Sequence, residues 1–123
     1  MNMFTEVLNS SPSINYQLPR PRVVEAVGNV INLDAPFTLE LPAILSDSYT
    51  DVLLVFVNTD GSYMPQAVVH APFISNLPTQ GVVDNRKLSP PFTAAHTAVL
   101  QCFIRLRQTE IWQRTPDSAV YRF

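Results

Sequence analysis

The chain has 123 residues and a formal net charge of −2, and 15% of its residues are charged, against about 25% in a typical soluble domain. Eleven prolines stand against three glycines, and 46% of the chain is hydrophobic. These figures exclude a wholly disordered chain, which needs low hydrophobicity and high charge. No apolar run reaches the roughly 18 residues of a membrane-spanning helix. A single cysteine excludes an intramolecular disulfide framework.

The length fits one domain with a core of its own. The first residues, MNMFTE, contain no basic stretch followed by an apolar one, so we expect no secretory signal peptide. The expected location is the virion if the chain is viral and the cytoplasm otherwise, with no transmembrane segment.

Residues 1–22 are polar and interrupted by prolines, as in the stretch Leu18-Pro19-Arg20-Pro21-Arg22. Closely spaced prolines oppose helix and favour extended backbone. We therefore expect an extended, proline-rich N-terminal arm over 1–22 and a single β-sandwich domain over 23–123. The arm has more apolar residues than a free tail needs, which favours docking on its own domain or on a neighbour.

Strand-like segments follow the arm. The runs 23–27 and 30–33 flank Gly28-Asn29, which predicts either a bulged strand or a tight hairpin. Residues 37–41 alternate between apolar and polar side chains, as a half-buried strand does. Residues 52–57 are apolar throughout, which is typical of a central strand buried on both faces.

The second half of the chain continues the pattern. A strand is expected at 66–71, and a proline-containing stretch from 73 to 92 is expected to be loop. Residues 97–108 form the clearest strand, with Leu100, Cys102, Ile104 and Leu106 on one face. The runs 111–114 and 119–123 are expected to pair as a closing hairpin.

Six to eight short strands at about ten-residue spacing, with no convincing helix, are typical of antiparallel all-β folds. We therefore predict an antiparallel β-sandwich or a jelly-roll-like barrel.

The side chains that carry chemistry form no recognisable catalytic pattern. His70 and His96 lack the spacing of metal ligands, and Cys102 falls among apolar neighbours, as a small core residue does. Asp47 and Asp51 lack the calcium-loop pattern. We expect no catalytic, cofactor-binding or metal-binding residues, and hence no enzyme and no cofactor.

Charge is unevenly placed along the chain. Residues 31–80 contain five acidic residues and no basic one, whereas 81–123 contain six basic and three acidic residues. Either acidic and basic strands are neighbours that pair across a sheet, or the two halves present complementary surfaces for head-to-tail assembly. Arg105 and Arg107 share a strand face with Phe103, which suits a nucleic-acid strand. Two arginines are few for that purpose, and we do not expect nucleic-acid binding.

These features favour a non-enzymatic structural or assembly protein, because interface cores are depleted in charge and an extended arm can add a strand to a neighbour. A virion component (capsid decoration, minor capsid or tail subunit) is the most specific form of this hypothesis. The expected partners are protein subunits of a homo- or hetero-oligomer, without a membrane. The expected interface residues are Phe4, Ile14, Tyr16, Leu18, Arg105 and Arg107.

The alternative is a carbohydrate-binding or adhesin-like β-sandwich. In that case Tyr63, Trp112 and Tyr121 would form a platform on which sugar rings stack. The competing interpretation of Trp112 is a buried side chain that closes the core.

Overall fold

The computed structural model describes residues 7, 10, 12–59, 63–88, 91–93 and 96–123, without the side chains of 63–67. Regular structure in these ranges consists of eight strands and one 3-10 turn, η1. No helix in them is long and apolar enough to cross a membrane. The elements are β1 (Arg22–Val23), β2 (Phe37–Leu41), β3 (Tyr49–Asn58), β4 (Tyr63–Pro72), β5 (Thr79–Val83), η1 (Asn85–Lys87), β6 (Thr97–Leu106), β7 (Trp112–Arg114) and β8 (Tyr121–Arg122).

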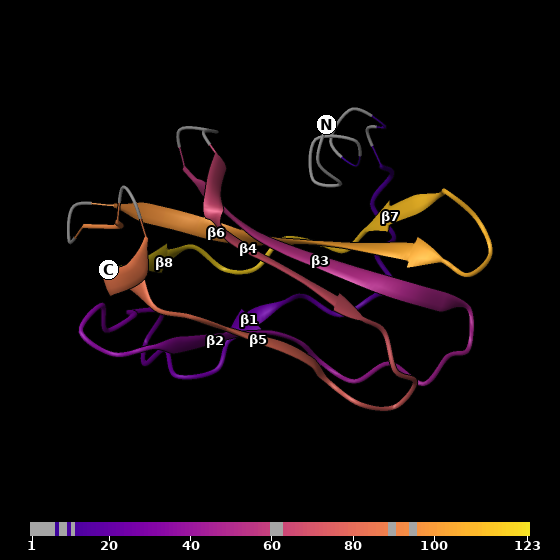
Figure 1. Ribbon diagram of the computed structural model, residues 1–123, viewed down its shortest axis with the longest axis horizontal. Helices are drawn as coiled ribbons and strands as arrows, with labels where there is room; N and C mark the ends of the chain where they lie inside the picture. Colours follow the sequence, from indigo (N-terminus) through magenta and orange to yellow (C-terminus); the bar gives the residue numbers. More distant parts are fainter. Residues whose placement is uncertain (1–6, 8–9, 11, 60–62, 89–90, 94–95) are drawn as a thin grey trace.

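The strands form two antiparallel sheets that pack against each other (Figure 1). The small sheet has the order β1-β2-β5, and the large sheet has the order β4-β3-β6-β7, with β8 pairing with β6. The prediction of an antiparallel all-β fold is therefore confirmed. Because each sheet keeps its own edges, the fold is a sandwich rather than a closed barrel.

The main core lies between the sheets and follows the expected alternation. The apolar side chains of β2 (Phe37, Leu39 and Leu41) are buried. They face one side of β3 and one side of β6, where Cys102 is fully buried. The ring of Phe56 in β3 meets the rings of Phe37 and Phe92 edge-on, at centroid distances of 6.0 and 5.5 Å. Edge-to-face pairs of this kind add to the stabilisation that burial provides.

The second face of β3 is also apolar and buried, as the run 52–57 predicts. Leu53, Val55 and Val57 join Phe103 of β6, Trp112 of β7 and Val7 in a separate outer cluster. The outward faces of sandwich sheets usually carry polar side chains, so this sheet is unusual in having apolar clusters on both sides.

Several strand predictions are wrong in detail. β5 lies inside the stretch 73–92 that we expected to be loop; the run TQGVV is short and contains a glycine, so its local signal is weak. β4 extends beyond 66–71 at both ends. β8 pairs with the start of β6 and not with β7, so the expected closing hairpin does not form.

The Gly28-Asn29 segment is a tight turn, as the second of the two predicted possibilities requires, but the flanking runs 23–27 and 30–33 are not the expected strands. β1 ends at Val23, and Val27 and Val30 pair only as an isolated bridge. Gly28 and Asn29 both have positive φ, 57° and 63°, as the favoured two-residue hairpin turns require. Val27 and Val30 exchange backbone hydrogen bonds of 3.1 and 3.0 Å. The amide of Arg122 donates to the carbonyl oxygen of Asn29 at 2.8 Å, which fastens the turn to β8.

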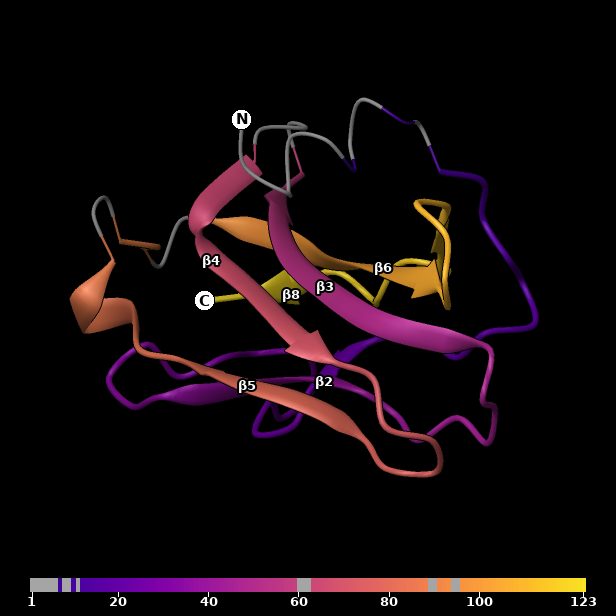
Figure 2. The same cartoon turned by 45° about the vertical axis from the view of Figure 1, so that its right-hand side comes forward.

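Residues 13–23, which we call the sealing segment, connect the large sheet to the small one along one long side of the sandwich (Figure 2). The Asn15 amide donates to the Arg114 carbonyl oxygen at 2.8 Å, and the Arg114 amide donates to that of Ser13 at 2.9 Å. Farther along, Leu18 enters the main core, and Val23 pairs with β2. This part of the arm is thus docked on its own domain.

Candidate interaction surfaces

A row of polar side chains crosses one end of the outer face of the large sheet. Asp51 and Arg105 are register partners on β3 and β6, and the Arg105 guanidinium donates to the Asp51 carboxylate. His70 Nε2 lies 3.4 Å from the other Asp51 oxygen, and Arg105 Nη1 lies 3.6 Å from Glu110. The Arg105 Cζ atom lies 5.8 Å from the ring centroid of Trp112. The strand that carries Asp51 (β3) therefore pairs with the strand that carries Arg105 (β6), as the first interpretation of the charge pattern predicts.

The small sheet carries a second polar row on its outer face. Arg22, Glu40 and Gln80 are register partners across β1, β2 and β5. Glu40 is buried; it accepts from Arg22 Nε at 2.6 Å and from the Gln80 amide. The buried Glu40 carboxylate is therefore paired within the domain.

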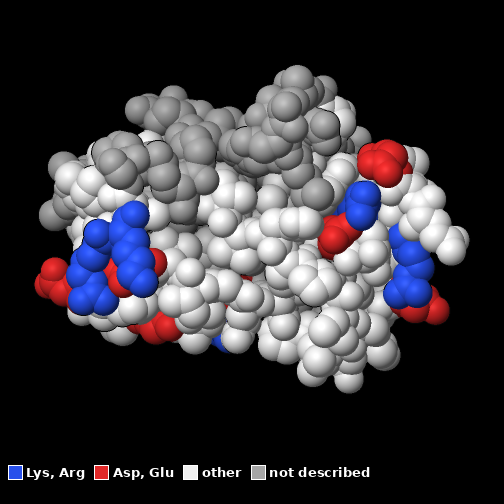
Figure 3. Space-filling view, viewed as in Figure 1, with Lys and Arg blue, Asp and Glu red and all other residues white. Residues whose placement is uncertain are grey.

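On one face of the molecule, charge is concentrated at the two ends. Figure 3 shows acidic and basic atoms beside one another at the two ends of one face, with uncharged atoms between them. The Asp84 carboxylate, for example, accepts two hydrogen bonds from the Arg86 guanidinium. The Arg86 guanidinium thereby holds the pKa of the Asp84 carboxyl below its usual value. Opposite charges that lie this close together give the surface little net field.

The predicted interface residues are scattered over the domain. Tyr16 is exposed, and Arg107 is exposed with its amide bonded to Ser48. Ile14 is half-buried against β7, and Leu18 lies in the main core. Arg105, as described above, is held by Asp51. Of these six predicted residues, Phe4 lies outside the described residues.

The predicted sugar platform is not assembled in the described part of the chain. Trp112 is buried in the outer cluster, whereas Tyr121 is buried in the core between the sheets. The Tyr121 hydroxyl oxygen accepts from the Val23 amide at 3.0 Å. Two side chains buried in different clusters share no surface on which a sugar ring can stack. The side chain of Tyr63 lies outside the described part of the structure.

A group of exposed apolar side chains, which the sequence interpretation missed, lies on the loops after β2 and β4. Leu45, Ile74 and Leu77 are 83%, 56% and 53% exposed, and we call them the tip patch. The two loops are tied together, because the Asn76 amide donates to the Ile44 carbonyl oxygen at 2.8 Å. The sequence signal for this patch is the presence of large aliphatic residues in loop segments. The sequence does not show whether these side chains are exposed, because that depends on the tertiary structure.

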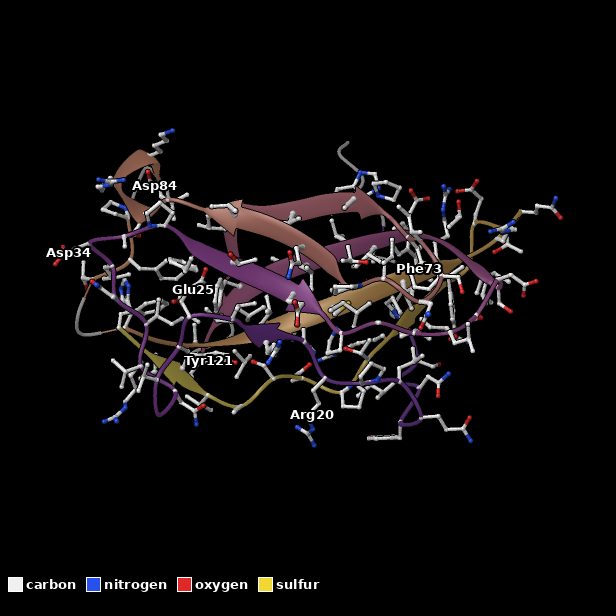
Figure 4. The ribbon with its side chains drawn as sticks, turned by 90° about the horizontal axis from the view of Figure 1, so that it is seen from below. Arg20, Glu25, Asp34, Phe73, Asp84 and Tyr121 are labelled. Atoms are coloured by element: carbon white, nitrogen blue, oxygen red, sulfur yellow. The ribbon has the colours of Figure 1, made fainter. Side chains whose placement is uncertain are left out.

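A second exposed apolar group, the turn patch, lies on the Gly28-Asn29 turn. Its members, Val27 and Val30, are 80% and 42% exposed. The turn is bonded to β8, which pairs with the start of β6, whereas the tip patch adjoins the start of β3, which pairs with the end of β6. The two patches therefore lie at opposite ends of the sandwich. Figure 4 shows the same polarity, with Asp34 and Asp84 at one end and Phe73 at the other.

Cys102 is buried in the main core, and the ring of His96 is hydrogen-bonded within its own loop. Burial raises the pKa of the Cys102 thiol far above its usual range, although a hydrogen bond with Thr115 acts in the opposite direction. His96 accepts from the Thr93 amide. Among the described residues no group of three or more His, Cys, Asp or Glu side chains could hold a metal ion.

Comparison of the sequence with known proteins identified no relative. No protein-family model matches the chain, and no curated protein is significantly similar to it.

Proposed function

We propose that this protein is a non-enzymatic assembly subunit that binds neighbouring protein subunits through uncharged parts of its surface. The most specific form of the proposal is a virion component: a capsid decoration protein, a minor capsid protein or a tail subunit. The observation that carries the proposal is the tip patch.

The tip patch has the properties of a prepared contact surface. Contiguous exposed apolar groups on a small domain commonly mark sites of interaction. A second hydrogen bond joins the loops after β2 and β4, in addition to the one between Asn76 and Ile44: the Ser46 amide donates to the Ser75 hydroxyl at 3.0 Å. Both loops are therefore held in place before any partner binds. A surface that is ordered in advance loses less conformational entropy on binding.

The positions of the two patches favour a head-to-tail contact. The tip patch and the turn patch differ in their residues and lie at opposite ends of the sandwich. A contact between unlike surfaces produces rings or open filaments, whereas a contact between like surfaces produces closed dimers. Docking of one end on another subunit therefore supports repeated assembly.

Sedimentation velocity over a range of concentrations tests the proposal. We expect the chain to associate as its concentration rises, or to bind a larger shell of subunits. Leu77→Asp should weaken this association roughly ten-fold or more, because it places a charge in an apolar contact. Ala119→Asp is the matched control, because it adds the same charge at an exposed position that belongs to neither patch.

A chain that stays monomeric at every concentration and binds no shell would overturn the proposal. Equal losses of association in the Leu77 and Ala119 variants would show that added charge, and not the tip patch, is responsible.

A further inference from the structure

The two long sides of the sandwich are closed differently. On one side the sealing segment connects the large sheet to the small one, and Ile14 bridges to β7. On the other side β4 and β5 are the terminal strands of their sheets, and in the described part of the chain no further strand pairs with either of them. Figure 2 shows β4 and β5 one above the other on this open side.

The backbone groups that β4 directs outward follow from its ladder with β3. The Phe73 amide donates to the Thr50 carbonyl oxygen at 3.0 Å, in register with the pairs of β3 and β4. Opposite residues in an antiparallel ladder alternate between bonded and non-bonded pairs. This alternation directs the N–H and C=O groups of Val68 and His70 away from β3. Pro72 is a third outward position, where the missing N–H costs no bond to β3.

The same reasoning applies to β5. The Val24 amide donates to the Thr38 carbonyl oxygen at 3.0 Å, so the backbone of Thr38 faces β1. The backbone N–H and C=O groups of the adjacent β2 residues, Phe37 and Leu39, therefore face β5. Given the register of β2 and β5, the backbone groups of Gln80 and Val82 point outward from the small sheet.

Neither edge is protected by charge. Natural edge strands are commonly guarded by charged side chains, above all lysine, but neither β4 (YMPQAVVHAP) nor β5 (TQGVV) contains Asp, Glu, Lys or Arg. The two prolines of β4, Pro65 and Pro72, lie on either side of Val68 and His70 and leave the outward N–H groups of these two residues in place. Val82 is 68% exposed. Between the two strands lies a hollow of about 430 Å³. Aliphatic residues that include Val68, Val69, Val83 and Leu88 line it, together with the oppositely charged Asp84 and Lys87.

We infer that the open side is a two-fold interface with a second copy of this chain, in which β4 pairs antiparallel with β4 of the second copy about an axis at Val69. Val68 of each copy then faces His70 of the other, and the outward N–H and C=O groups of both residues are used. A strand without charge can face itself across such an axis without like-charge repulsion.

A second copy fits this side better than a single extended peptide. β4 and β5 lie close together here, because Val69 packs directly on the backbone of Gly81. A peptide strand can pair with only one of the two edges. A second copy presents both edges at the same spacing, so that β5 pairs with β5 of the second copy beneath the β4 contact and the hollow is covered. The inference rests on the proposed assembly role and specifies one of its contacts.

Proline substitution at an outward position tests this interface without breaking the ladder inside the subunit. His70→Pro removes an outward N–H group, and His70→Ala is the matched control, because it also loses the contact with Asp51 but keeps that N–H group. Val82→Pro and Val82→Ala form the equivalent pair on β5. Circular dichroism melting identifies any variant that fails to fold.

In sedimentation equilibrium we expect both proline variants to raise the dimer dissociation constant roughly ten-fold or more, and both alanine variants to change it much less. Oxidation of the Val69→Cys variant should yield a disulfide-linked dimer, since residues at the axis form a close non-bonded pair. The fully buried Cys102 does not compete for this reaction.

Association that is equal in the proline and alanine variants, or an oxidised Val69→Cys variant that stays monomeric, would overturn the inference. If this occurs while Leu77→Asp still weakens assembly, only the open-side interface fails. If dimers form through the open side but Leu77→Asp has no effect and nothing larger assembles, the proposed function fails instead. A chain that is monomeric at every concentration overturns both.

Discussion

Asp51 and Arg105 lie directly opposite each other on β3 and β6, and their ion pair is largely withdrawn from water, with side-chain exposures of 16% and 25%. The pair joins the two central strands of the large sheet at the end where the outer apolar cluster gives way to polar side chains. Arg105 also lies beside Trp112, so the ion pair holds a cation over the edge of that cluster.

Asp51→Asn should lower the free energy of unfolding by about 1–3 kcal/mol, because it leaves a partly buried guanidinium with only the exposed Glu110, 3.6 Å away, as a charged partner. The measurement is urea denaturation at neutral pH. In a double-mutant cycle with Arg105→Met we expect the two losses to overlap, so that the double variant is more stable than the sum of the single effects predicts. Purely additive losses would show that the two side chains are not coupled.

Gly81→Ala should destabilise the fold by about 1–3 kcal/mol, the usual range for overpacking. A Cβ atom at position 81 would lie only 2.3 Å from Cγ1 of Val69, and a β-branched side chain has few alternative rotamers. Adding Val69→Ala should recover most of this loss. Thermal denaturation of the single and double variants checks the prediction, and a double variant that is less stable than Gly81→Ala alone would contradict it.

Glu25 should make stability depend on pH in the acid range. Burial acts to raise its pKa, but hydrogen bonds from the Thr38 amide and hydroxyl outweigh that effect and hold the pKa below its usual value. The stabilisation from a carboxyl with a lowered pKa is fully present above the unfolded-state pKa and is lost as pH falls through the folded-state pKa.

The difference in unfolding free energy between the wild type and Glu25→Gln should therefore be largest near neutral pH and should shrink under acid conditions. Chemical denaturation at a series of pH values measures it. A difference that grows as the pH falls would contradict the assignment.

Cys102 should resist thiol reagents in the folded protein. The thiol is fully buried between the sheets, and burial raises its pKa, so the reactive thiolate is scarce. We expect modification by a disulfide reagent only as fast as the domain unfolds, with the rate rising in parallel with the unfolded fraction as urea is added. Rapid modification in the absence of denaturant would show that the core opens locally.

The fold class and the central strands could be predicted from sequence because their signals are local. The run 52–57 has apolar residues on both faces, and it is buried on both faces. Alternation placed Leu100, Cys102 and Ile104 together on the inner face of β6, where they are buried. Periodicity of this kind reports directly on which faces are covered.

Strand partners and surface contacts could not be predicted in the same way. β5 has little signal of its own and owes its extended form to pairing with β2, and β8 finds its partner far away in β6. Whether an aliphatic residue such as Leu45 is exposed depends on which loop lies beside it. The Trp112 side chain is buried, as the second interpretation held, but in the outer cluster and not between the sheets.

The sealing segment has a consequence for the order of folding. Its contacts join distant parts of the chain: the hydrogen bond between Val23 and Tyr121 spans 98 residues, and Ile14 bridges to Arg114. Contacts with such long loops form slowly, because the entropy of closing the loop is lost before the contact stabilises anything. The hairpin of β3 and β4 can form much earlier. Until the sealing segment docks, both long sides of the sandwich are open, and the partly folded chain passes through its most aggregation-prone stage.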